Sequence, residues 1–211
     1  MSKHLVDDAI EQRKKLAFIL YNPVCYTHTS WLHSWNISKA QPDRLINHHL
    51  IHQSETLLSN TENLNEANVV DCMHENKLLL VCLNSWDAIP KISYVLGAHY
   101  LRNLILKTNY VSHLNWQAIR FMNLPTVPCS FDAVFKHFTQ VNEEVITATG
   151  MLILNALFSH FPKLLLGLLP LTLPESTYRL FLQYPRIKAS ARDRFLYKAA
   201  LAHVENYCAT T

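Results

Sequence analysis

Residues 89–102 are IPKISYVLGAHYLR, and this stretch indicates the fold class of the chain most clearly. Its apolar residues Ile89, Ile92 and Leu96 recur at the spacing that places side chains on one face of a helix. The pattern predicts a helix that starts near Asp87 and runs towards Lys107.

Gly97 lies in the middle of this predicted helix. A glycine inside a helix costs about 1 kcal/mol relative to alanine, so we expect a packed neighbour or the close approach of another helix there. Tyr94 at i−3 shares a face with Gly97, whereas His99 at i+2 does not. We expect these residues to hold the fold together, with contact to a partner as the alternative.

Glycine is scarce in the whole chain of 211 residues, which contains only Gly97, Gly150 and Gly167. Average usage would give about fifteen. Glycines so far apart exclude the Gly-rich loops that bind phosphate, and an all-β chain would need more of them for its turns. The sequence therefore predicts an all-α protein, a single compact irregular multi-helix domain over residues 1–211.

Further elements follow from periodicity, prolines and capping residues. Helices are expected at residues 2–20, from Pro42 through Leu58, at 115–124, at 130–161 with a break near Gly150, in short segments between Pro162 and Pro185, and after a capping box of Ser190 and Asp193. Residues 59–68 are expected to form an exposed loop. Residues 69–83 fit a buried helix or a buried strand, and the helical neighbours favour the helix.

The most apolar region is Val145 to Leu173, and it is interrupted by polar residues and prolines. Its pieces are shorter than the ~20 residues that a membrane-spanning helix needs. We interpret the region as buried core. Because the N-terminus also lacks an apolar signal-peptide core, we expect the protein to be cytosolic.

Histidines are numerous, and the densest group is His48-His49-x-x-His52. His48 and His52 would share one helix face, and Glu55 follows at i+3 from His52, so a small helical metal-binding protein is the alternative hypothesis. Solvated helix histidines explain the pattern as well. The five cysteines form no C-x-x-C pair, no nucleophile motif is present, and no cofactor is expected.

Positive charge is concentrated near the C-terminus, at Arg186, Lys188, Arg192 and Arg194. This group predicts a basic face for an acidic protein, a nucleic acid or a membrane. A sequence pI of 8.6 and the absence of a nucleic-acid-binding motif argue against nucleic acid. A protein partner and an ordinary solvated helix start both remain open.

Three segments together resemble one known family. They are ILYNPVCYTH at residues 19–28, the stretch at residues 89–102, and NWQA at residues 115–118. The resemblance is to the cytosolic accessory proteins of bacterial type III secretion systems called OrgA, MxiK or SctK, and it covers about residues 16 to 124. The residues that carry it, and that it offers as a possible interface, are Pro23, Tyr26, His28, Pro90, Tyr94, Gly97, His99, Arg102 and Trp116.

The resemblance implies a non-enzymatic adaptor of the sorting platform of a virulence-associated injectisome. Such an adaptor links the cytoplasmic domain of the inner-membrane ring protein to the major pod (C-ring-like) protein, and platform assembly and protein secretion require it. It implies no cofactor, no catalytic residue and no nucleic acid. It also implies a place at the cytoplasmic face of the bacterial inner membrane, held there through protein contacts only.

Overall fold

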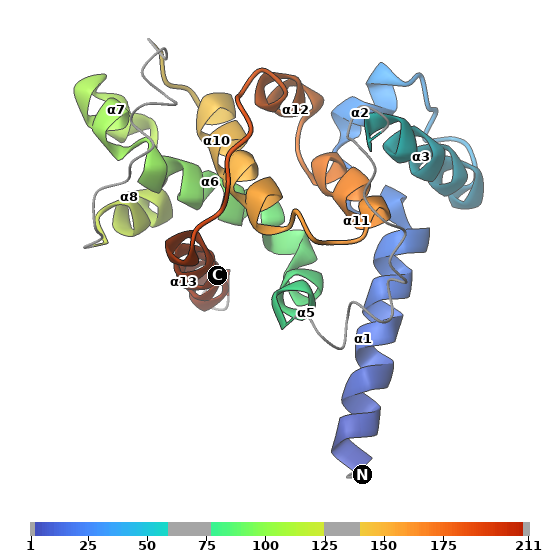
Figure 1. The fold of residues 1–211 in the computed structure, drawn as a ribbon. Helices are drawn as coiled ribbons and strands as arrows, with labels where there is room; N and C mark the ends of the chain where they lie inside the picture. The colour runs from blue at the N-terminus through green and yellow to red at the C-terminus, as the bar shows by residue number, and fades with distance from the viewer. Residues whose placement is uncertain (1–2, 59–76, 125–139, 209–211) are drawn as a thin grey trace. The chain divides into compact units, whose positions relative to one another are not determined.

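The computed structural model describes residues 3–58, 77–124 and 140–208, and every regular element within them is a helix (Figure 1). The predicted all-α fold class is confirmed. The chain divides into two compact units, Met1–Asp87 with Phe158–Glu175 and Ala88–Leu157 with Ser176–Thr211. That the two units fold as a single domain stays a prediction.

The first unit contains one long N-terminal helix, a second long helix and several short ones. Its elements are α1 (Lys3–Tyr21), η1 (Pro23–Cys25), α2 (Thr29–Ser34), α3 (Asp43–Leu58), α5 (Lys77–Asn84), η2 (Trp86–Ala88), α11 (Lys163–Leu168) and η4 (Leu169–Thr172). Helix α3 packs against α11 and η1, and α1 packs against α5, α3 and α11 (Figure 1).

The predicted end of the first helix is confirmed at Asn22-Pro23, where a residue before proline avoids helical geometry. Beyond this turn, a buried indole fixes the position of α2. Trp31 is 2% exposed, and its Nε1–H donates to the carbonyl oxygen of Leu173 at 2.8 Å. This bond ties α2 to the chain that leaves η4, across 142 residues of sequence.

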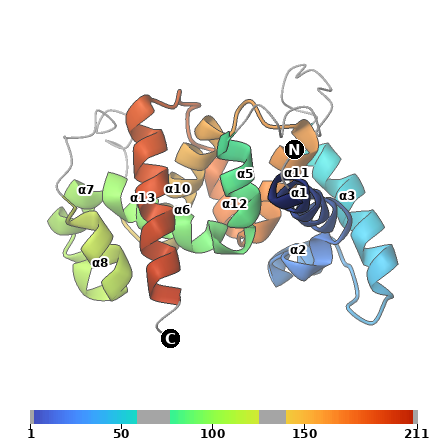
Figure 2. The same cartoon turned by 90° about the horizontal axis from the view of Figure 1, so that it is seen from below.

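The second unit is built around α6 (Ile89–Tyr100). Its other elements are α7 (Arg102–Lys107), η3 (Tyr110–His113), α8 (Trp116–Met122), α10 (Glu143–Leu157), α12 (Glu175–Phe181) and α13 (Ala191–Cys208). Helix α6 packs against α10, α8 and α13, and α13 also contacts α8 and α10 (Figure 2). The apolar face predicted from Ile89, Ile92 and Leu96 is completely buried in these contacts.

Two of the predicted helices differ from the structure. The helix expected at residues 87–107 is divided at Leu101, whose ψ of 12° leaves helical geometry and separates α6 from α7. The break expected near Gly150 is wrong, because α10 continues through that residue. Helix α6 packs so closely against Gly150 that only a glycine fits there, so this glycine serves the contact between two helices and does not mark a break.

Other predictions concern the ends and the middle of the chain. Of the segment 69–83, residues 77–83 are helical, as favoured, and residues 69–76 lie outside the described residues. The expected loop at 59–68 and residues 130–139 of the helix expected at 130–161 also lie outside them. The capping box is confirmed, since Ser190 N donates to Asp193 Oδ2 at 2.6 Å and Asp193 N donates to Ser190 Oγ at 3.3 Å. The core interpretation of the apolar region is also confirmed, because residues 145–154 are all buried.

None of the helices in the described ranges combines the length and the apolar character that crossing a membrane requires.

Candidate partner-binding surfaces

The N-terminal motif residues lie at the turn that follows α1. Pro23 is buried and opens η1. The hydroxyl of Tyr26 donates to the carbonyl oxygen of Ile19 at 2.7 Å, and its ring meets the edge of Trp86 at 5.6 Å between centroids. Burial, with a smaller contribution from Cys25, raises the pKa of Tyr26. The Tyr26 side chain therefore holds the first unit together.

His28 is exposed and caps the start of α2. Its Nδ1 accepts from the backbone N–H of Ser30 at 3.2 Å, which satisfies one free donor of the helix start. Its own backbone N–H donates to the carbonyl oxygen of Leu171 at 2.8 Å. These bonds position the turn between α1 and α2, and the His28 residue as a whole remains exposed.

The central motif is mostly buried. His99 is 4% exposed and meets the rings of Tyr100 and Phe121 edge-on, at 5.9 Å and 5.7 Å between centroids. Desolvation lowers the pKa of His99, so its neutral form is favoured in the fold. Tyr94 is half-buried, and burial followed by the charge of Glu143 raises its pKa. A role of these residues in partner binding stays a prediction.

Pro90, Arg102 and Trp116 occupy helix starts. Pro90 is in the first turn of α6, where a missing N–H costs nothing, and Arg102 opens α7 half-buried. Trp116 follows the cap Asn115 and is 50% exposed, with the guanidinium of Arg120 over its ring at 5.7 Å from the centroid. Trp116 is therefore the large aromatic of the motif that a partner can reach.

The predicted basic face lies at the start of α13 and in the segment that leads into it. Arg186, Lys188 and Arg194 are exposed, whereas Arg192 is half-buried. The only carboxylate between residues 176 and 204 is Asp193, which is 3% exposed and accepts bonds from Ser190 and from the hydroxyl of Tyr100. The face is therefore positive without a neighbouring exposed acid from this part of the chain.

Large apolar side chains reach solvent in both units. They are Ile10, Phe18, Tyr21 and Leu45 in the first unit, and Leu106, Trp116, Leu182 and Phe195 in the second. Sequence reasoning missed Phe195, which is 68% exposed. The available signal was its position on the final helix, two residues before Tyr197 and therefore away from the buried face that Tyr197 and Val204 define.

A groove of about 470 Å³ lies on the first unit between α1 and the end of α5. It is lined by Glu11, Lys14, Lys15, Phe18, Ile19, Leu83, Asn84, Trp86 and Asp87. Lys15 Nζ donates to Asn84 Oδ1 at 3.1 Å, which links the two walls. The lining mixes both signs of charge with apolar surface, so it does not indicate one class of ligand.

The residues of the alternative metal site lie on α3. His48, His52 and Glu55 are all exposed. In the ranges that the structure describes, no three His, Cys, Asp or Glu side chains are placed so that they could hold a metal ion. Cys25 and Cys82 are free thiols, the first exposed and the second buried.

Comparison with known proteins identifies the family. A family model described as "Bacterial type III secretion apparatus protein (OrgA_MxiK)" matches residues 16–206. The match continues through the C-terminal third, beyond the part in which the sequence motifs are recognisable. Neither the curated proteins nor the solved structures include a significant match. Because the family model covers most of the chain, the protein belongs to the OrgA/MxiK family of bacterial type III secretion apparatus proteins.

Proposed function

We propose that this protein is a non-enzymatic adaptor of the type III secretion sorting platform. In this function it links the cytoplasmic domain of the inner-membrane ring protein to the major pod protein, and secretion depends on the link. The observation that carries the proposal is the family match over residues 16–206, together with the motif segments at residues 19–28, 89–102 and 115–118.

The division into two compact units supports a linking role. An adaptor needs at least two separate contact surfaces, and each unit exposes its own large apolar side chains, such as Tyr21 in the first and Phe195 in the second. Exposed aromatic side chains are the kind of residue that contributes most to protein–protein binding. The adaptor would work at the cytoplasmic face of the inner membrane through these protein contacts, without nucleic acid.

The proposal is tested first by affinity purification. The tagged protein is expressed from its own locus in the native bacterium, and the proteins that co-purify after gentle lysis are identified by mass spectrometry. We expect the inner-membrane ring protein and the major pod protein. Recovery of neither, with the tagged protein supporting normal secretion, contradicts the linking function.

A clean deletion provides the second test. We expect loss of secretion and loss of the cytoplasmic pods in cryo-electron tomograms, with both restored by the wild-type gene. Normal secretion in the deletion strain contradicts the proposal.

A further inference from the structure

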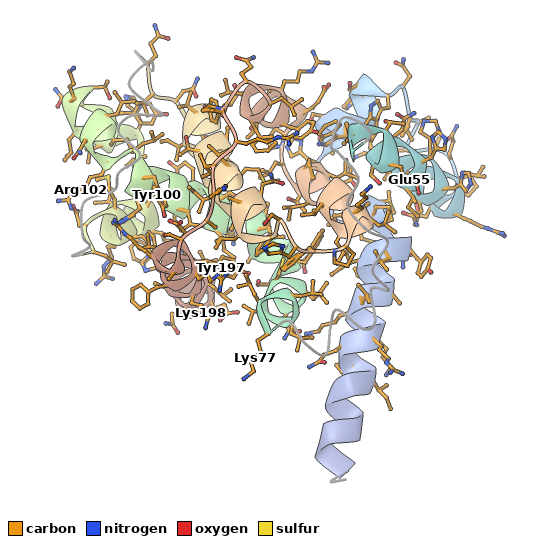
Figure 3. The ribbon with its side chains drawn as sticks, viewed as in Figure 1. Glu55, Lys77, Tyr100, Arg102, Tyr197 and Lys198 are labelled. Atoms are coloured by element: carbon orange, nitrogen blue, oxygen red, sulfur yellow. The ribbon has the colours of Figure 1, made fainter. Side chains whose placement is uncertain are left out.

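One stripe of α13 faces solvent along the length of the helix. Its exposed residues are Ala191, Arg194, Phe195, Lys198, Ala202, Glu205 and Asn206. Apart from two adjacent pairs, they recur every three or four residues, which keeps them on one side of the helix. The opposite side carries Leu196, Tyr197, Ala200 and Val204, which are buried. Consecutive residues Tyr197 and Lys198, labelled in Figure 3, thus belong to opposite faces.

The cations of this stripe and of the segment before it reach solvent. Arg186, Lys188, Arg194 and Lys198 are exposed, and in the described parts of the chain none of them forms an ion pair with a carboxylate. Asp193, their nearest acid in sequence, is already bonded to Ser190 and Tyr100 in the buried capping network. The positive charge is therefore available to a second molecule.

Two of these charges also stand where the helix itself disfavours them. The N-terminal end of a helix carries partial positive charge, so cations there lower helix stability and anions raise it. Arg194 lies in the first turns of α13, and Lys188 is three residues before it starts. Asp193 supplies one buried carboxylate at this end of α13, and the exposed cations beside it can accept a further negative charge from a second molecule.

An aromatic ring lies among the cations. Phe195 is 68% exposed and sits beside Arg194 and one turn before Lys198. An apolar anchor flanked by charges resembles the centre and rim of a protein interface. Ala191 and Ala202, at i−4 and i+7 from Phe195, leave room for another helix to approach closely.

We propose that this surface, made of Arg186, Lys188, Arg194, Phe195 and Lys198, docks an acidic amphipathic segment of a protein partner. The proposal names the chemistry of one partner-binding surface of the adaptor and rests on the function proposed above. The partner segment carries Asp or Glu opposite the four cations and an apolar residue against Phe195. The far end of the partner segment lies beside Glu205, and a basic residue of the partner there pairs with this carboxylate.

The charge pattern favours a protein over other anions. A nucleic acid or an anionic bilayer presents negative charge everywhere, and Glu205 at the end of the stripe repels both. Nucleic-acid strands are bound by several stacked aromatics, and a membrane surface takes a broad apolar helix face, whereas this stripe has one ring. A polypeptide can match cations at one end and a carboxylate at the other.

The test measures binding of the full-length protein to two purified probes, the cytoplasmic domain of the ring protein and the major pod protein. Three variants are compared with the wild type: Arg194→Glu with Lys198→Glu, Phe195→Ser alone, and the control Lys39→Glu with Arg44→Glu. The control makes the same charge change at exposed positions of the first unit. Circular dichroism and thermal unfolding confirm that each variant is folded.

We expect the charge-reversal variant to bind one of the two probes at least about tenfold more weakly, with wild-type affinity for the other. The wild-type affinity for the affected probe falls as salt increases, because the surface charges are screened. Phe195→Ser weakens binding of the same probe but preserves the salt dependence of that binding. The control variant binds both probes with wild-type affinity.

Three results overturn the proposal. Unchanged binding of both probes by the charge-reversal and Phe195→Ser variants shows that this surface is not the docking site, while the adaptor function stands. The wild type could instead bind phosphatidylglycerol vesicles or an RNA oligonucleotide. If the charge reversal abolishes that binding and leaves the binding of both protein probes unchanged, the surface is assigned to that anion. Failure of the wild type to bind either probe, with normal secretion in the deletion strain, removes the adaptor function itself.

Discussion

Gly97 of α6 and Gly150 of α10 face each other where these two helices touch backbone to backbone. A Cβ atom added at Gly97 would lie 2.7 Å from the carbonyl carbon of Ile146 and 3.1 Å from the backbone nitrogen of Gly150. A Cβ atom added at Gly150 would lie 2.8 Å from Cα of Ser93. Each helix thus presents a glycine to the backbone of the other.

Gly97→Ala is expected to destabilise the protein strongly. The new methyl group meets backbone atoms of α10, which cannot rotate away as a side chain can, so the helices must separate and lose packing around the contact. We expect a loss of about 3 kcal/mol in the free energy of unfolding, measured by urea denaturation. Ala202→Ser, which adds one atom in solvent, is the control, and an equal midpoint for both variants would contradict the helix contact.

Tyr100 and Asp193 are expected to stabilise the second unit as a pair. The Tyr100 hydroxyl donates to Asp193 Oδ1, and the same carboxylate accepts from Ser190. Tyr100→Phe should cost about 1–2 kcal/mol, and Asp193→Ala more, because the latter also leaves the Ser190 donors unpaired. A double-mutant cycle should show the two losses to be non-additive. Additive losses would mean that the two side chains act independently.

Stability should fall in mild acid because of His99. Its folded-state pKa lies below the value of 6.5 of the unfolded chain, so below pH 6.5 the unfolded state takes up a proton first. This loss of stability from His99 is absent well above pH 6.5 and grows as the pH falls towards the folded-state pKa of His99.

The measurement compares the free energy of unfolding of the wild type with that of His99→Gln between pH 8 and pH 5.5. The difference between the two should shrink as the pH falls, because only the wild type carries the His99 penalty. His113→Gln, which changes an exposed histidine, is the control and should follow the wild type. A pH-independent difference between wild type and His99→Gln contradicts the effect.

Trp31→Phe is expected to loosen the first unit. The substitution removes the N–H that pairs with the Leu173 carbonyl and leaves a space in a site that is 98% buried. Loss of a buried hydrogen bond together with a small cavity should cost about 2–3 kcal/mol in the free energy of unfolding. Trp35→Phe, at a half-buried neighbour, should cost clearly less, and the reverse order would contradict the assignment.

Much of the helical structure could be predicted locally. Short-range features such as an apolar period, a proline or a capping residue predict the first helix, the helix after Asn115 and the capping box at Ser190. The family could also be recognised from motif residues such as Pro23 and Gly97. The spacing of Tyr197 and Val204 was enough to place Phe195 on the other face of the last helix, whereas the large exposed fraction of its ring came only from the tertiary structure.

By itself the sequence determined that the chain is helical, because three glycines, regular apolar spacing and well-placed caps act within a few residues of one another. Only the tertiary structure decided that the helix at Gly150 continues, that the helix after Ile89 is divided at Leu101, and that Asp193 bonds Tyr100. The continuity at Gly150 depends on packing against α6, and the bond of Asp193 depends on a tyrosine 93 positions away in the sequence. Burial against such a neighbour outweighs the local cost of a glycine or a buried carboxylate, and local patterns carry no information about it.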